Sequence, residues 1–139
     1  MIIVDTNVIS ELMRPVPDDA VLQWMNDQRK LDIGTTAITV AEILYGIEAV
    51  AEGRRKAQLI EASALLFDTE FKGRILAFDK MAAVEYAAIV IQCRRAGTPI
   101  SMADAQIAAI CRRTGAPLAT RNTRDFKQTG ITLINPWLS

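Results

Sequence analysis

The chain opens with the apolar run Ile2 to Val4, which is followed directly by the polar run Asp5 to Asn7. A short uninterrupted run of β-branched residues predicts a strand buried on both faces, as in a parallel sheet. In open α/β sheets ligands bind beyond the carboxyl ends of the strands, so Asp5 would stand where a catalytic or metal-binding carboxylate is placed. The alternative is that Asp5 only caps a helix over about Val8 to Met13.

The rest of the chain alternates short apolar runs with segments of helical periodicity. Such alternation predicts parallel βαβ units and a doubly wound α/β sheet. No repeat or linker interrupts it, so we expect a single domain over residues 1–139. Further strands are expected at Leu31 to Thr35, Gly73 to Asp79, Pro117 to Thr120 and Ile131 to Ile134, with a polar loop at Arg121 to Phe126. Further helices are expected from Asp18, from Thr39 to Gly53, from Arg54 through Leu66, from Lys80 to Ala96 and from Ser101 to Gly115.

The composition limits the kinds of ligand and catalytic group that the chain can use. The 16 basic residues equal the 16 acidic ones, so no overall field attracts a polyanion, and any nucleic-acid contact must be local. The chain has no histidine, and its two cysteines have no metal-ligand spacing, which excludes structural zinc and a Cys/His or Ser/His nucleophile. Two buried free thiols suit a reducing compartment, and no apolar run is long enough to span a membrane. We therefore expect a cytoplasmic protein.

Acidic residues recur where an apolar element meets a helix or a polar loop. Three of these acids could simply take part in helix caps, because each follows a cap-forming residue by three positions. The functional alternative is that the acids converge at the carboxyl end of the first strand. The four acids are Asp5, Glu42, Asp104 and Asp125, and the three cap-and-acid pairs are Thr39 with Glu42, Ser101 with Asp104, and Asn122 with Asp125.

Convergent carboxylates would require cations, because like charges in one pocket repel strongly. Ligation by oxygen alone selects hard ions such as Mg²⁺ or Mn²⁺. Two such ions about 3.5–4 Å apart support displacement at a phosphodiester without a His, Cys or Ser nucleophile. Hydroxyl and amide side chains beside the acids would orient the carboxylates or metal-bound water. The alternative is that they serve only in turns and helix caps. They are Thr6, Ser101, Thr120 and Asn122. Arg121 and Arg124 would contact phosphates at the rim.

Four ordered segments carry a family resemblance. They are Met-Ile-Ile-Val-Asp5-Thr-Asn-Val-Ile-Ser, Thr-Val-Ala-Glu42-Ile-Leu-Tyr-Gly, Ile-Ser-Met-Ala-Asp104-Ala-Gln-Ile-Ala-Ala, and Leu-Ala-Thr-Arg-Asn122-Thr-Arg-Asp125-Phe with a closing Asn-Pro-Trp. The chain resembles PIN-domain ribonucleases, and more narrowly the VapC and FitB-like toxins of bacterial type II toxin–antitoxin pairs. The resemblance implies a three-layer α/β/α sandwich with a short, mostly parallel sheet. It also implies a Mg²⁺-dependent endoribonuclease, commonly a homodimer, inhibited by a cognate antitoxin that also binds operator DNA.

The resemblance further implies roles for the acids. Asp5, Asp104 and Glu42 would be metal ligands, and Asp125 would be a weaker fourth carboxylate. The chain departs from the family at one position, because many PIN domains carry an acid where this chain has Asn122. Either Asn122 or Asp125 would therefore complete the acidic site.

Three other functions compete with this interpretation. An aspartyl-nucleophile phosphatase also begins with an acid after the first strand, but it would have a second acid at position 7, where this chain has Asn7. A phospho-receiver is disfavoured because Arg121 and Asn122 stand where its lysine would follow the last strand. A non-catalytic subunit of a DNA-binding toxin–antitoxin complex would use all four acids as caps.

Overall fold

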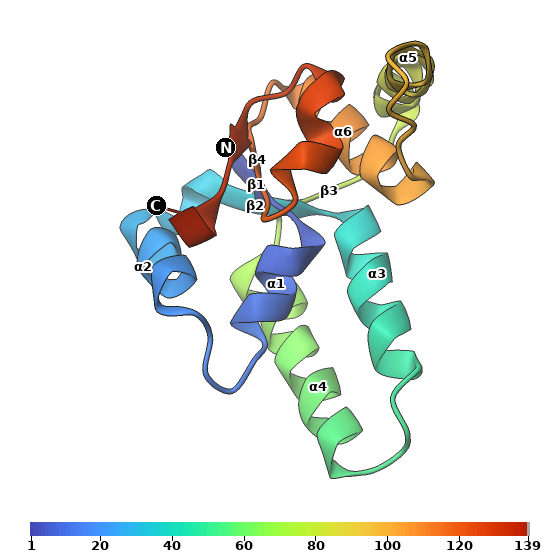
Figure 1. Cartoon of the computed structure of the whole chain (residues 1–139). Helices are drawn as coiled ribbons and strands as arrows, with labels where there is room; N and C mark the ends of the chain where they lie inside the picture. The colour runs from blue at the N-terminus through green and yellow to red at the C-terminus, as the bar shows by residue number, and fades with distance from the viewer. Residues whose placement is uncertain (139) are drawn as a thin grey trace.

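A five-stranded, fully parallel sheet forms the centre of the molecule (Figure 1). The computed structural model describes residues 1–138. In space the strands follow the order β3-β2-β1-β4-β5. Their bounds are β1 Ile2–Val4, β2 Ile33–Thr36, β3 Ile75–Leu76, β4 Leu118–Ala119 and β5 Leu133–Ile134. The expected α/β fold with a parallel sheet is confirmed.

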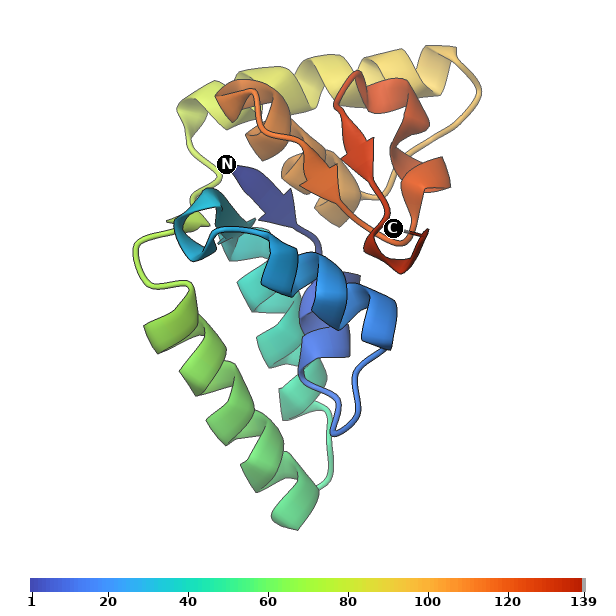
Figure 2. The ribbon, with the colours of Figure 1, turned by 90° about the vertical axis from the view of Figure 1, so that its left-hand side faces the viewer.

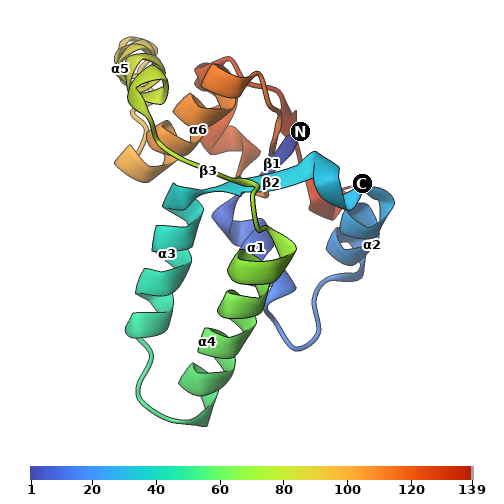
Figure 3. The same ribbon diagram turned by 180° about the vertical axis from the view of Figure 1, so that it is seen from behind.

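Helices cover both faces of the sheet and give three layers. Figure 1 shows α5 and α6 on one face and α1 to α4 on the other. Side chains of β1 alternate between the two cores, because Ile3 packs with α5 and α6 whereas Val4 packs with α1 to α4. Seen from behind, α3 and α4 form a hairpin that projects away from the sheet (Figure 3). The helices are α1 Thr6–Leu12, α2 Asp19–Asp27, α3 Ala37–Glu48, α4 Arg54–Leu65, α5 Lys80–Arg95 and α6 Met102–Thr114.

Several element bounds differ from those expected. Strand β2 begins at Ile33, because Leu31 is exposed and lies in a short 3₁₀ helix, η1 (Lys30–Asp32). Strand β3 is shorter than expected, because the chain after it must reach Asp79, which caps α5 by accepting a hydrogen bond from Ala82 N (2.9 Å). Helix α3 ends at Glu48 rather than near Gly53.

The expected polar loop after β4 is instead a 3₁₀ helix, η3 (Thr123–Thr129), in which Phe126 is buried. Burial of the Phe126 side chain in the core holds this otherwise polar segment against the protein. Two further short elements were not expected: a π-helical turn, η2 (Leu66–Glu70), and a final 3₁₀ helix, η4 (Pro136–Leu138).

The strand order places a switch point beside β1. After β1 the chain builds β2 and β3 on one side, then crosses to build β4 and β5 on the other. A crevice at the carboxyl ends of β1 and β4 is the position where doubly wound sheets bind ligands. Behind it, Cys93 and Cys111 are buried free thiols in the core shared by α5 and α6. Within residues 1–138, no helix has the length and apolar character needed to cross a membrane.

Candidate functional site

Asp5 is buried at the carboxyl end of β1, with only 4% of its surface exposed. Its Oδ1 accepts a hydrogen bond from the backbone N of Thr6 (2.8 Å), so it caps α1 as one interpretation expected. Its Oδ2 accepts a hydrogen bond from the hydroxyl of Thr120 (2.8 Å), which lies just past β4. Asp5 therefore caps a helix and also lies in the crevice between β1 and β4.

Asn7 holds the segment after β4 against β1. Its Nδ2 donates to Thr120 Oγ1 (3.2 Å) and more weakly to Asp5 Oδ2 (3.4 Å). Its Oδ1 accepts a hydrogen bond from the backbone N of Arg121 (3.1 Å). Sequence reasoning gave Asn7 no role in the site, although Asn7 follows the strand acid by two residues. Thr120 Oγ1 also accepts from the backbone N of Asn122 (3.1 Å), so the Thr120 hydroxyl links all these groups.

Glu42 faces α1 across the site. The Thr6 hydroxyl donates to Glu42 Oε1 (2.6 Å) and lies 3.1 Å from the Thr39 hydroxyl. The interpretation of Glu42 as half of a capping box with Thr39 is wrong. The cap of α3 is Thr36, whose hydroxyl accepts from the backbone N of Thr39 (3.1 Å), so Thr39 and Glu42 both lie inside the helix.

Asp104 lies in the first turn of α6 and is half-buried. Ser101 caps this helix by accepting a hydrogen bond from the backbone N of Asp104 (3.2 Å), as its spacing predicted. Burial raises the pKa of Asp104, the Ser101 hydroxyl lowers it, and Asp125 and Glu42 raise it again by charge repulsion.

Electrostatic coupling joins the four acids. Burial raises the pKa of Asp5 to about 6, although hydrogen bonds from Thr120 and Thr6 lower it. Repulsion from Asp104 and Glu42 adds to the increase in the pKa of Asp5. Repulsion from Asp125 in turn adds to the increase in the pKa of Asp104, so the pKa values of Asp5 and Asp104 depend on carboxylates from other segments of the chain.

A pocket of about 480 Å³ opens above these acids. Several of the site residues expected from the sequence do not line this pocket in the described part of the chain. Thr120 is buried against Asp5, Ser101 caps α6, and Arg124 and Asp125 lie on η3. The expected cap contact from the Asn122 side chain to Asp125 does not form. The lining residues are Asp5, Thr6, Asn7, Ser10, Glu11, Arg14, Glu42, Asp104, Arg121, Asn122 and Trp137.

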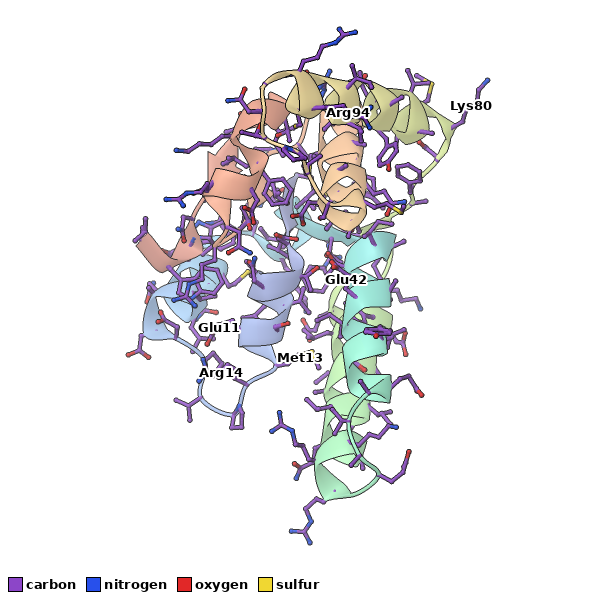
Figure 4. The ribbon with its side chains drawn as sticks, turned by 45° about the vertical axis from the view of Figure 1, so that its right-hand side comes forward. Glu11, Met13, Arg14, Glu42, Lys80 and Arg94 are labelled. Carbon is purple, nitrogen blue, oxygen red and sulfur yellow. The ribbon has the colours of Figure 1, made fainter. Side chains whose placement is uncertain are left out.

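Two arginines at the rim of this pocket are held by other side chains. The guanidinium carbon of Arg121 lies 5.1 Å from the centre of the Trp137 ring, a cation–π contact. Farther along α1, Nη1 of Arg14 lies 3.3 Å from Oε2 of the buried Glu11, which also accepts a hydrogen bond from the backbone N of Asp18 (2.9 Å). Figure 4 shows Glu11 and Arg14 near the end of α1, with Glu42 on the neighbouring helix. Sequence reasoning missed Glu11, Arg14 and Trp137. For Glu11 and Arg14 a signal existed, because they stand at the i, i+3 spacing of an ion pair along a helix.

The pocket suits a hard cation by donor type and by charge. Its acidic lining residues offer oxygen ligands. Burial is the main cause of the raised pKa values of Asp5 and Asp104, and a divalent ion would relieve the repulsion that adds to it. Within residues 1–138, no three acidic or thiol side chains already stand in a closed ligand arrangement. Glu42 is exposed and Asp104 is half-buried, so both side chains have room to turn toward an ion.

Comparison with known proteins gives a consistent result. Residues 2–131 match the PIN domain model. The chain is 40% identical over 140 residues to VapC ribonuclease Y4jK of Sinorhizobium fredii, covering 99% of this chain and 98% of that protein. It is 38% identical over 137 residues to toxin FitB of Neisseria gonorrhoeae, covering 99% of both. A solved structure of FitAB bound to an IR36 DNA fragment superposes with a TM-score of 0.92 at 38% identity, covering 99% of this chain and 96% of that one.

Proposed function

The chain belongs to the PIN domain family, and on this premise we propose that it is a Mg²⁺-dependent endoribonuclease, the toxin of a toxin–antitoxin pair. The observation that carries the proposal is the coupling of Asp5, Glu42 and Asp104 in one pocket beyond the carboxyl end of β1. The reaction would be hydrolysis of RNA phosphodiester bonds.

In this proposal Asp5, Asp104 and Glu42 hold Mg²⁺, with Mn²⁺ as a substitute. Bound there, the metal would activate water and neutralise charge on the phosphate. The Thr120 hydroxyl and the Thr6 backbone N favour the ionised form of Asp5 by donating hydrogen bonds to it. Asp125 adds negative charge beside Asp104 from outside the pocket lining.

Other side chains would position the substrate and the carboxylates. Arg121, held over Trp137, offers a guanidinium to a phosphate at the rim. The Thr6 hydroxyl fixes Glu42 by donating to it. The Asn122 side chain lines the pocket, where it would contact water or substrate. Ser101 would act indirectly, because its hydroxyl lowers the pKa of Asp104.

A second pocket supports inhibition by an antitoxin. It measures about 430 Å³, lies between α1, α3 and α4, and shares Thr6 and Glu42 with the acidic pocket. Its walls combine apolar side chains, including Met13, Ile43 and Ile47, with polar and charged ones. A segment of a cognate antitoxin lying there would reach the acids, and operator DNA would be bound only through that antitoxin. The solved structure of FitAB bound to a DNA fragment supports an association of such complexes with DNA, and we propose that a homodimer of this chain forms the core of its own complex.

The proposal is tested by incubating antitoxin-free protein with a defined structured RNA. We expect cuts with Mg²⁺ or Mn²⁺ and none with a chelator. The protein carrying Asp5→Asn should not cut under either condition. Cutting that persists in the chelator, or in the Asp5→Asn protein, would contradict the proposal. The absence of both cutting and ion binding would instead favour a non-catalytic subunit whose acids act as caps.

A further inference from the structure

Three exposed cations follow one another along η3 at intervals of three residues. They are Arg121, just before the helix, and Arg124 and Lys127 within it. A 3₁₀ helix has three residues per turn, so Arg124 and Lys127, which both lie in η3, stand above one another. Arg121 precedes Asn122, the residue before the helix, and extends the row toward the pocket. The buried residues Phe126 and Thr129 share the same interval and therefore occupy a different side of η3. We call Arg121, Arg124 and Lys127 the η3 stripe.

The stripe begins at the acidic pocket. Arg121 lines that pocket and is fixed there by Trp137, whereas Arg124 and Lys127 lie outside the lining. With a rise of about 2.0 Å per residue, Arg124 and Lys127 lie about 6 Å apart along the helix. This interval is comparable to the distance between neighbouring phosphates of a nucleic-acid strand.

Among the described residues, no ion pair neutralises the positive charges of the stripe. None of its three members forms an ion pair there, whereas Arg112 pairs with Glu85 (3.1 Å) and Arg113 with Asp79 (3.7 Å). The acid within η3, Asp125, follows Arg124 by one residue and so lies about a third of a turn away from it. The stripe therefore presents positive charge to solvent.

The stripe is also held in place from behind. The side chain of Gln92 on α5 donates a 2.7 Å hydrogen bond to the backbone O of Gln128. The Thr129 hydroxyl donates to the backbone O of Phe126 (2.5 Å), and the Phe126 ring lies in the core. Figure 2 shows η3 beside the C-terminal part of α5. A row of cations on a well-anchored helix would lose little conformational freedom on binding a charged strand.

We propose that the η3 stripe is a track for the phosphates of one RNA strand, which it leads away from the acidic pocket. The inference rests on the proposed ribonuclease function and adds the path of the substrate and a role for Lys127. Aromatic residues make up only 6% of the chain, and none belongs to the stripe, so the track would hold the strand through its backbone and not through base stacking. Binding along it would be independent of sequence and sensitive to salt.

The experiment measures RNA binding, separately from cleavage. A fluorescent single-stranded RNA is titrated with the Asp5→Asn protein in a chelator at several salt concentrations. For single strands, the logarithm of the association constant falls with the logarithm of salt concentration with a slope of about −0.7 for each phosphate neutralised. We expect Arg124→Gln and Lys127→Gln each to make the slope shallower by about 0.7. Lys80→Gln is the control, because Lys80 lies at the far end of α5 from η3 and should leave the slope unchanged (Figure 4).

Three results would overturn the track. If the Asp5→Asn protein binds RNA but Lys127→Gln leaves its salt slope unchanged, the track is wrong while the ribonuclease proposal stands. If Lys127→Gln weakens binding of an acidic protein partner but not of RNA, the stripe serves that partner instead. A protein without the stripe substitutions that binds no RNA would contradict the ribonuclease proposal itself, and the track with it.

Discussion

The hydroxyl of Thr120 donates a 2.8 Å hydrogen bond to Oδ2 of Asp5, although 115 residues separate the two in sequence. This contact joins the carboxyl ends of β1 and β4 at the point where the strand order changes direction. Both side chains are buried, so the bond is protected from competing water. The ionisation of the buried carboxylate in the first segment therefore depends on a residue from the last third of the chain.

Replacing Thr120 by Val tests this dependence with little change in shape. The substitution removes the donor that lowers the pKa of Asp5, so the carboxylate should ionise less readily. Groups that orient a metal-binding carboxylate typically contribute a factor of about 10–100 in activity or metal affinity, and we expect RNA cleavage to fall by that factor. Thr120→Ser keeps the hydroxyl and should retain most of the rate. Equal rates for the Val and wild-type proteins would show that the hydrogen bond has no role in catalysis.

Stability should depend on pH through Asp5. Its pKa is about 6 in the folded protein and near its ordinary value of 3.8 when unfolded. Between these values the folded state keeps a proton that the unfolded state has lost, so the free energy of unfolding should fall as pH rises from 4 to 6. The full difference corresponds to about 3 kcal/mol. Burial and repulsion raise the pKa of Asp104 in the same direction.

Denaturant unfolding in a chelator, repeated across this pH range, measures the effect. The Asp5→Asn protein cannot ionise at this position and should lose most of the decline between pH 4 and 6. A decline of the same size in both proteins would mean that Asp5 does not titrate as its burial indicates.

Glu42→Gln isolates the charge of Glu42 from its hydrogen bond. The amide oxygen of Gln can still accept from the Thr6 hydroxyl, but it contributes no negative charge to the pocket. We expect cleavage to fall at least about tenfold, while the free energy of unfolding changes by about 0.5 kcal/mol or less, as for most exposed positions. Glu48→Gln on the same helix is the matched control, because Glu48 is exposed and lies outside both site pockets. A similar loss in both proteins would mean that the charge of Glu42 has no special role.

Local signals were sufficient to predict much of the fold. The alternation of apolar runs with helical segments predicted the parallel sheet. The end of α6 was predicted correctly, because Gly115 adopts a left-handed conformation (φ 70°) that glycine accepts without strain. The start of α3 was predicted two residues too late. Both Thr36 and Thr39 are good caps, and only packing against Thr6 decides between them.

The site was harder to predict where it depends on distant contacts. The meeting of acids from separate segments was expected from the strand-end rule and from the family resemblance. The bonds from Asn7 to Thr120 and to the backbone of Arg121 cross more than a hundred residues, and no local pattern indicates them. The cation–π contact between Arg121 and Trp137 spans a much shorter stretch of chain, but no local pattern indicates it either. Asp125 was expected to pair with Asn122 by a cap contact, but the 3₁₀ geometry of η3 does not form it.

Mn²⁺ binding is the most direct test of the central claim that Asp5 and the other pocket acids share a cation. Wild-type protein and the Asp5→Asn protein are titrated with Mn²⁺ above pH 6, where Asp5 is ionised, and bound ion is followed by calorimetry. The account predicts saturable binding by the wild-type protein and its loss in the Asp5→Asn protein, with the folded state of both confirmed in parallel. Equal Mn²⁺ affinity in the two proteins would contradict the account.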